Sequence, residues 1–271
     1  MDYDPFRIRD HVADFDAIVA DIVTRSAAAR ASLPVKADIA YGSGPSESLD
    51  IFSPVDASGP RPVHMFIHGG YWRMFSKDDY SYIANAVTAA GAIAVIIDYA
   101  LMPSVRLDVI VDQVRRARDW VRKNIGGYGG DPERFTVSGH SAGAHLASCL
   151  FTTDQANNGV DAALLLSGLY DLEPLQSSFL KAEIALTDEE VARFTPLSMS
   201  HDPDTRVEIM VGASETEPFH AQAADFALHL GNAGLDVSQK VIVARNHMNI
   251  VRDLGDPHTI TGRHLKRLIA A

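Results

Sequence analysis

The chain has almost none of the residues that build disulfides and metal–thiolate sites. Among its 271 residues there is a single cysteine, Cys149. One cysteine cannot close an internal disulfide and cannot supply the cysteine clusters of zinc or iron–sulfur sites. Cys149 stands in a run of small and apolar residues, which predicts a core side chain. This cysteine usage favours a cytoplasmic protein without a cysteine-based metal site.

Long apolar runs and excess positive charge are also missing. No stretch has the roughly 20 apolar residues of a membrane-spanning helix, and the first residues lack the basic region and apolar run of a secretory signal. Acidic residues outnumber basic ones by 35 to 24, which gives a formal net charge of -11. That balance argues against nucleic acid or an anionic membrane as a partner. The 46% of hydrophobic residues is ordinary for a globular protein.

Strand and helix patterns alternate along the rest of the chain. Residues 1–36 have apolar side chains at helical spacing and predict a helical segment ahead of the sheet. Residues 170–203 have helical patches and no strand pattern, which predicts an inserted cap. The expected strands cover residues 38–41, 48–52, 63–67, 92–98, 134–138, 161–166, 206–211 and 237–244. This alternation, without an internal repeat, predicts one α/β domain over residues 1–271 with a doubly wound, mostly parallel sheet.

The strongest local signal is the pentapeptide Gly139-His-Ser-Ala-Gly143. It stands between a strand pattern and a helix pattern rich in small residues, as a nucleophile elbow does. In such a turn the two glycines leave room for neighbouring backbone, and the serine is lifted clear of the sheet. The sequence therefore predicts that Ser141 is a nucleophile and that the amide of Ala142 helps to hold an oxyanion.

A second glycine turn follows the predicted strand 63–67. The sequence His68-Gly-Gly-Tyr-Trp-Arg73 places consecutive glycines at the strand end, where backbone amides can turn toward a ligand. Here an α/β-hydrolase supplies the other half of its oxyanion hole. We expect the amides of Gly70 and Tyr71 to act there and Gly69 to permit the turn. Trp72 joins Tyr71 as a candidate substrate contact, with packing as the alternative role.

A serine nucleophile needs a histidine base, and that histidine needs a carboxylate to hold its tautomer. Of the 11 histidines, only His247 directly follows a late strand, in a polar turn before the last helix. The carboxylate is expected after strand 206–211, in the chain order serine, acid, histidine. Glu215 lies closer to that strand end than Glu217 does, and is favoured. Glu217 and Asp171 are the alternatives.

Several segments together carry a resemblance. They are His68-Gly-Gly-Tyr-Trp72, Gly139-His-Ser-Ala-Gly-Ala-His-Leu146, Ser167-Gly-Leu-Tyr-Asp-Leu-Glu-Pro-Leu175, Gly212-Ala-Ser-Glu-Thr-Glu-Pro-Phe-His-Ala-Gln222 and Asn246-His247. From about residue 38 to the end, the chain resembles the kynurenine formamidase (arylformamidase) branch of the α/β-hydrolases, a neighbour of the hormone-sensitive-lipase-like esterases. That branch usually has Asp where Glu215 stands, and often an acidic residue where Ala213 stands.

The resemblance implies a serine hydrolase that needs no metal or organic cofactor. Its substrate would be a small-molecule ester or amide with an aromatic part, bound near Tyr71, Trp72 and His140. A carboxylesterase and an arylformamidase differ here only in substrate, because function depends on the site rather than on the fold. The alternatives are an acyltransferase with the same triad and a non-catalytic ligand-binding protein. A homodimer is a further expectation.

Overall fold

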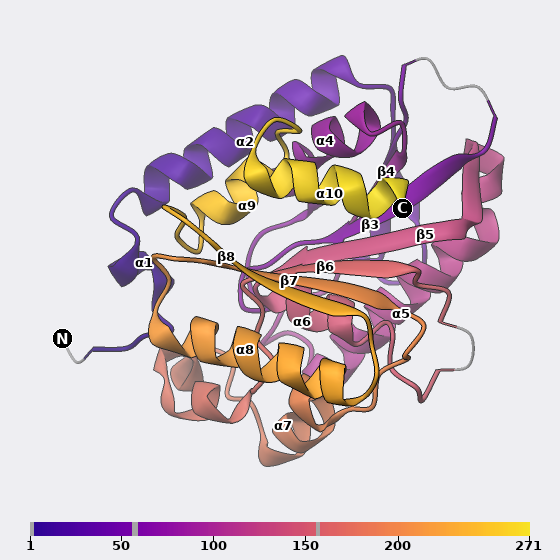
Figure 1. The fold of residues 1–271 in the computed structure, drawn as a ribbon. Helices are drawn as coiled ribbons and strands as arrows, with labels where there is room; N and C mark the ends of the chain where they lie inside the picture. The colour runs from indigo at the N-terminus through magenta and orange to yellow at the C-terminus, as the bar shows by residue number, and fades with distance from the viewer. Residues whose placement is uncertain (1–2, 56–58, 156–157) are drawn as a thin grey trace.

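One eight-stranded sheet forms the centre of the molecule (Figure 1). The computed structural model describes residues 3–55, 59–155 and 158–271. The strands are β1 (Val35–Ala40), β2 (Ser48–Phe52), β3 (Arg61–Ile67), β4 (Ile93–Ile97), β5 (Gly130–His140), β6 (Ala162–Leu166), β7 (Arg206–Gly212) and β8 (Val237–Ile242). Their order in the sheet is β1-β2-β4-β3-β5-β6-β7-β8. The pairs β1–β2 and β2–β4 are antiparallel and the other five pairs are parallel, which confirms the predicted α/β fold class.

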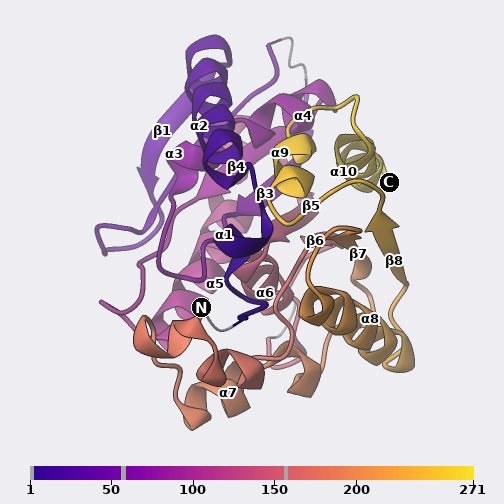
Figure 2. The ribbon, with the colours of Figure 1, turned by 90° about the vertical axis from the view of Figure 1, so that its left-hand side faces the viewer.

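Helices cover both faces of this sheet (Figures 1 and 2). The α-helices are α1 (Ile8–His11), α2 (Phe15–Ser32), α3 (Lys77–Tyr80), α4 (Ile83–Ala89), α5 (Leu107–Asn124), α6 (Ala142–Ser148), α7 (Asp188–Phe194), α8 (Glu217–Asn232), α9 (Asn249–Leu254) and α10 (Ile260–Ala270). Helices α2, α4, α9 and α10 lie together on one face, and α5, α6 and α8 lie on the other. The sheet is therefore the middle layer of three.

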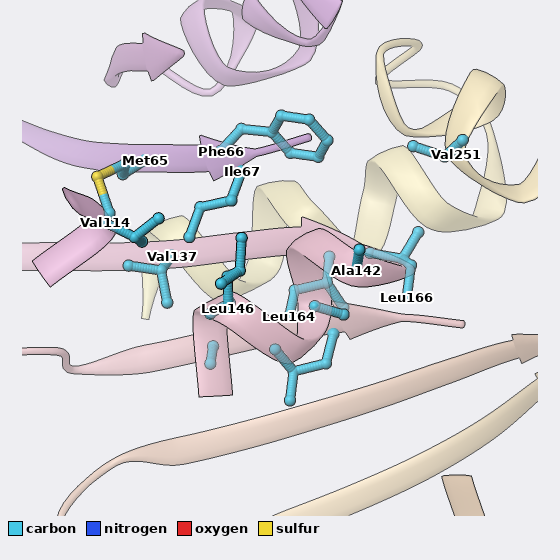
Figure 3. Packing of buried hydrophobic residues seen from close by; sticks show 14 of the residues in the cluster. Met65, Phe66, Ile67, Val114, Val137, Ala142, Leu146, Leu164, Leu166 and Val251 are labelled. Carbon is cyan, nitrogen blue, oxygen red and sulfur yellow. The ribbon is translucent and has the colours of Figure 1, made fainter. Parts of the chain in front are cut away.

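The core lies where β3, β5 and β6 meet the small-residue helix α6 (Figure 3). Phe66 and Ile67 of β3 and Val137 of β5 are fully buried. Leu146 of α6 points toward these strands from one side, with the small residues Ala142 and Gly143 one turn before it, whereas the Phe66 side chain points to the other side of the sheet. Strands buried on both faces are typical of a parallel sheet covered by helices. This packing fixes the carboxyl ends of β3 and β5, where the candidate site is formed.

The N-terminal segment differs from the single helical stretch that the sequence predicts. It consists of two helices, Ile8–His11 and Phe15–Ser32, separated by a short extended turn at Val12. The second helix ends at Ser32, two residues before Pro34, and β1 starts at Val35, three residues before the predicted strand. Hydrophobic spacing did not reveal the break, since the apolar residues on both sides of it bury against the same core.

Residues 170–203, the expected insertion, contain helical turns and no strand. They include α7 and the short 3-10 helices η2 (Glu173–Ser177), η3 (Phe179–Ala182) and η4 (Pro196–Ser198). Thr187 begins α7 with a capping box, in which its side chain accepts from the Glu190 amide and the Glu190 side chain accepts from the Thr187 amide. A fourth 3-10 helix, η1 (Ile125–Tyr128), follows α5 elsewhere in the chain.

Candidate active site

The turn between β5 and α6 has the geometry expected of a nucleophile elbow. Ser141 has φ 55° and ψ -121°, a strained conformation for a residue with a side chain. A Cβ atom built on Gly139 would lie 2.1 Å from the Gly143 carbonyl oxygen, and one on Gly143 would lie 2.1 Å from that of Ile67. Both contacts are with backbone that cannot move aside. Only glycine fits at either position, for the steric reason inferred from the sequence.

The glycine turn after β3 lies directly beside this elbow. A Cβ on Gly69 would be 2.7 Å from the His140 carbonyl oxygen and 3.2 Å from the Ser141 Cβ. Gly70 has φ 105°, and a Cβ there would be 2.3 Å from the Met74 carbonyl oxygen. Within the described part of the chain, the amides of Gly70, Tyr71 and Ala142 donate to no protein acceptor. Three backbone donors are thus available around Ser141.

His247 and Glu215 form a hydrogen-bonded pair at the carboxyl ends of β8 and β7. The His247 Nδ1–H donates to Glu215 Oε2 at 2.7 Å. The other carboxylate oxygen, Oε1, accepts from the Gly212 amide and from the Ser167 hydroxyl, both at 2.6 Å. The Glu215 side chain is fully buried. With three donors, this carboxylate is fixed in place and holds the imidazole in one tautomer.

Ser141 and His247 line the same cavity. In the described structure, the Ser141 hydroxyl makes no hydrogen bond to the His247 ring. In unliganded enzymes such bonds are often long, and they shorten when substrate binds. The structure therefore brings the three predicted triad residues to one place, with the acid–histidine bond formed and the histidine–serine bond open.

The cavity above Ser141 has a volume of about 210 Å³. Its floor is formed by Gly70, Tyr71, His140, Ser141 and His247. The remaining walls come from three parts of the chain and from Met248, which follows the histidine. The N-terminal segment contributes Arg7, Ile8, Arg9, Asp10 and Phe15. The residues after the glycine turn contribute Arg73, Met74, Phe75 and Tyr80, and the insertion contributes Phe179 and Glu183. The insertion thus forms one wall, whereas the N-terminal segment provides more of the cover.

Three polar contacts join the N-terminal segment to the rest of the site, and a fourth lies within the segment. The Tyr71 hydroxyl donates to the Phe6 carbonyl at 2.6 Å, and the Thr216 hydroxyl donates to the Pro5 carbonyl at 2.8 Å. Asp4 accepts from the Phe179 amide with one carboxylate oxygen and from the Phe6 amide with the other. Burial raises the pKa of Tyr71 well above its usual value, so the phenol stays neutral and keeps donating.

His140, a predicted substrate contact, lines the cavity but is only 2% exposed. Its Nε2–H donates to the main-chain carbonyl of His247 at 2.8 Å, and the two rings lie 4.7 Å apart. Burial, and then the neighbouring His247, lower the pKa of His140 well below its usual value. A neutral His140 places no positive charge beside the His247 ring.

Trp72 corrects the sequence prediction. Its side chain is fully buried and is not among the residues that line the cavity. The indole N–H donates to His145 Nδ1 at 3.3 Å, and the two rings meet edge to face. The left-handed backbone at Tyr71 and Trp72 turns the second ring away from the site and into the core. Trp72 packs the glycine turn onto α6, and of the aromatic pair only Tyr71 reaches the cavity.

The other acid candidates lie elsewhere. Glu217 is the first residue of α8 and is exposed. Asp171 accepts from the Glu173 amide, just ahead of η2, and makes no bond to His247. Sequence reasoning missed Ser167, Phe179 and the N-terminal wall. Ser167 could have been noticed, since it stands directly after β6 at the edge of the sheet where the other site residues gather.

No metal site accompanies these residues in the part of the chain that the structure describes. Groups of three or more His, Cys, Asp or Glu side chains placed to hold an ion do not occur there. Within the described ranges, no helix is long and apolar enough to cross a membrane.

Comparison with known proteins agrees with this arrangement. A family described as "alpha/beta hydrolase fold" matches residues 64–250. Among solved structures, a protein from Silicibacter superposes with a TM-score of 0.86 at 23% identity over 98% of each chain. An esterase from Pyrobaculum calidifontis superposes with a TM-score of 0.73 at 17% identity, over 94% of this chain and 90% of the other. At such identities these structures bear on the fold alone.

Curated relatives narrow the family. Kynurenine formamidase of Danio rerio is 29% identical over 99% of this chain and 94% of its own length. Kynurenine formamidase of Salmo salar is 31% identical over 82% of this chain and 78% of its own length. Esterase LipQ of Mycobacterium tuberculosis is 38% identical over a shorter stretch, 50% of this chain and 35% of its own length.

The protein is accordingly a hydrolase of the esterase and amidase kind. The chain belongs to the α/β-hydrolase family, in its kynurenine formamidase branch.

Proposed function

We propose that the protein hydrolyses small acyl esters or aryl formamides through a Ser141–His247–Glu215 triad. The observation that carries the proposal is the bond from His247 Nδ1–H to a fully buried Glu215, beside a serine on a strained elbow. A carboxylate there leaves Nε2 as the free basic nitrogen, on the side of the ring away from Glu215. This arrangement is able to take a proton from a serine hydroxyl.

The reaction has two halves. In the first, the Ser141 oxygen attacks the acyl carbonyl carbon while His247 takes the hydroxyl proton, and the carbonyl oxygen becomes an oxyanion. The amides of Gly70, Tyr71 and Ala142 are the donors for that charge, and losing one such donor costs about 3 kcal/mol of transition-state stabilisation. His247 then protonates the departing alcohol or amine, which leaves an acyl-serine.

In the second half, His247 takes a proton from water, and the hydroxide attacks the acyl-serine carbonyl. The bond to Ser141 breaks, the serine regains its proton from His247, and a carboxylic acid departs. Glu215 remains ionised throughout and stabilises the imidazolium in both halves. The acyl group passes to water in this step. In an acyltransferase it would pass to another alcohol or amine instead.

The cavity supports a small acyl group and an aromatic leaving group. Its volume of about 210 Å³ is small beside the several hundred cubic ångströms of many ligand pockets. Phe15, Phe75 and Phe179 supply apolar ring surface, and the walls carry both arginine and carboxylate groups. Such a lining suits an aromatic ring that bears a polar or charged substituent. Binding energy from that remote part can orient the carbonyl, so it raises kcat as well as lowering KM.

A substrate series tests the proposal. We expect kcat/KM for phenyl esters to be greatest at acetate and to fall steeply toward octanoate, with N-formylkynurenine also turned over. A maximum at octanoate would contradict the small acyl site. Turnover of short esters without the formamide would assign a plain carboxylesterase. A product in which the acyl group appears on an added alcohol or amine instead of water would assign an acyltransferase.

We also propose that the protein is cytoplasmic, which its single cysteine and acidic composition support. We further propose that it forms a homodimer. Light scattering of the purified chain measures the oligomeric state directly. A mass of one chain, 29.4 kDa, would contradict the dimer.

A further inference from the structure

The peptide group between Gly69 and Gly70 is held from one side by His68. The His68 Nδ1–H donates to the Gly69 carbonyl oxygen at 2.8 Å, in a side chain that is fully buried. In a trans peptide the C=O and the N–H point in opposite directions. A fixed Gly69 carbonyl therefore fixes the direction of the Gly70 amide on the other side. Gly70 lines the cavity with Ser141, and its amide has no acceptor among the described residues.

The His68 ring is itself held by its surroundings. It stacks on Tyr99 with ring centres 4.2 Å apart and planes 9° apart, and Tyr80 lies nearly parallel to it at 6.2 Å. The Tyr99 hydroxyl donates to the His68 carbonyl at 2.8 Å. A Cβ on Gly143 would touch that same carbonyl oxygen at 2.5 Å. His68 thus connects the glycine turn to the elbow at both its side chain and its backbone.

The bond also decides the tautomer of His68. A carbonyl oxygen can only accept, so the proton is on Nδ1 and Nε2 carries the lone pair. Nε2 has no hydrogen-bond partner among the described residues. Asp98 Oδ1 lies 3.7 Å from it and accepts from the Lys77 amide at 2.6 Å. Burial lowers the pKa of His68 to about 4, so the ring is neutral near pH 7. A proton on Nε2 instead would leave the Gly69 carbonyl without its donor.

We propose that His68 is a positioning residue for the oxyanion site, whose Nδ1–H holds the Gly69 carbonyl and so directs the Gly70 amide toward Ser141. The inference rests on the proposed function, because the amide acts on the oxyanion of that reaction. His68 does not touch the substrate. Its contribution is to the orientation of a donor, and such a contribution belongs to the transition state more than to substrate binding.

Three substitutions separate the donor from the bulk of the ring. His68→Asn places an amide N–H near the position of Nδ1, His68→Gln places one near Nε2, and His68→Phe keeps the stacking on Tyr99 without any donor. We expect kcat to fall about 100-fold in the Gln and Phe variants, with KM within about twofold of the unchanged protein. The Asn variant should retain kcat within about fivefold.

One control variant accompanies this test. His64→Asn removes another buried histidine, which lies within β3 and bonds the Thr136 and Ser138 side chains of β5 rather than the glycine turn. It should lower the melting temperature and leave kcat unchanged. If the Asn and Phe variants of His68 lose activity equally while folded, or if the Phe variant keeps full kcat, the positioning role is wrong.

A second readout does not depend on turnover. In the ¹⁵N–¹H spectrum of the full chain, the imidazole of His68 should show one slowly exchanging proton on Nδ1, assigned by its loss in His68→Asn. A proton on Nε2 would overturn the inference even in an active enzyme. A proton on Nδ1 in a protein that cleaves none of the esters and formamides would instead place the failure with the proposed function.

Discussion

At the scale of single residues, the elbow makes the sharpest prediction about Ser141. Ser141 is 2% exposed but lines the cavity, so a reagent that fits the cavity can reach its oxygen. An aryl phosphonate should label one serine per chain, and peptide mass mapping should find the label on Ser141. Ser141→Ala should remove both the label and the turnover. A label on Ser167, or active protein that takes up no label, would contradict the assignment.

The carboxylate makes a second prediction at this scale. Glu215→Gln should lower kcat by roughly 10³- to 10⁴-fold, because a neutral amide neither stabilises the imidazolium nor holds the correct tautomer. KM should change little, since Glu215 does not line the cavity. The measurement is steady-state kinetics on phenyl acetate.

The matched control is Glu217→Gln, two residues away. Glu217 is exposed at the start of α8 and makes no bond to His247. We expect its kcat to stay within about twofold of the unchanged protein. Equal losses in both variants, or a larger loss in Glu217→Gln, would move the acid of the triad along the chain.

At the scale of elements, the insertion should set the preference for the leaving group. The Phe179 ring at the start of η3 lines the cavity, meets Tyr71 edge to face at 5.7 Å and lies under the Arg7 guanidinium at 4.7 Å. Phe179→Ala should raise KM for aryl esters about tenfold and change KM for methyl esters little, because only the aryl group loses contact area. Lys181→Ala, an exposed neighbour that does not line the cavity, is the control.

The elements also explain what the sequence could and could not predict. The elbow and the glycine turn were predictable because backbone sterics require glycine at fixed spacings, and those spacings are visible in a single chain. The α/β layering was predictable from apolar strands that alternate with helices. Trp72 was misplaced because two left-handed residues reverse its direction, and no local pattern signals that turn.

The cover of the site was missed for a different physical reason. It depends on contacts between residues far apart in sequence, such as Tyr71 with Phe6 and Asp4 with Phe179. Helical spacing in the first residues indicates which side is apolar, but not which surface that side meets. Tertiary contacts of this kind are formed only when the sheet has brought both partners together.

At the scale of the whole molecule, several buried histidines link stability to pH. Four of them are His64, His68, His145 and His201, each at most 3% exposed, and His140 is a fifth whose pKa burial also lowers. Burial lowers the pKa of His64 to about 3 and those of His68, His145 and His201 to about 4. In the unfolded chain a histidine titrates near 6.5. Below that pH the unfolded state binds more protons than the folded state, so stability falls as pH decreases from about 6.5 to about 4.

One carboxyl group acts in the opposite direction. Burial raises the pKa of Asp98 to about 6, so the folded state takes up this proton before the unfolded state does. As the pH falls from about 6 to the ordinary aspartate pKa near 4, protonation of Asp98 therefore increases the stability of the folded protein. The change in stability due to Asp98 offsets about that of one of these buried histidines. The net expectation is still a loss of stability on acidification.

The substitution His145→Gln isolates the contribution of one buried histidine to the pH dependence of stability. The His145 Nε2–H donates to the Phe194 carbonyl at 2.8 Å, and a glutamine amide can replace that donor without titrating. The variant should be less stable than the unchanged protein at pH 7.5, because Trp72 loses its acceptor. Between pH 7.5 and pH 5.0 it should lose about 2 kcal/mol less of its unfolding free energy, which is the proton uptake of one unfolded histidine. Urea unfolding at the two pH values measures both numbers. An unchanged pH dependence in the variant would mean that His145 is already protonated in the fold, and that the acid sensitivity of the molecule arises elsewhere.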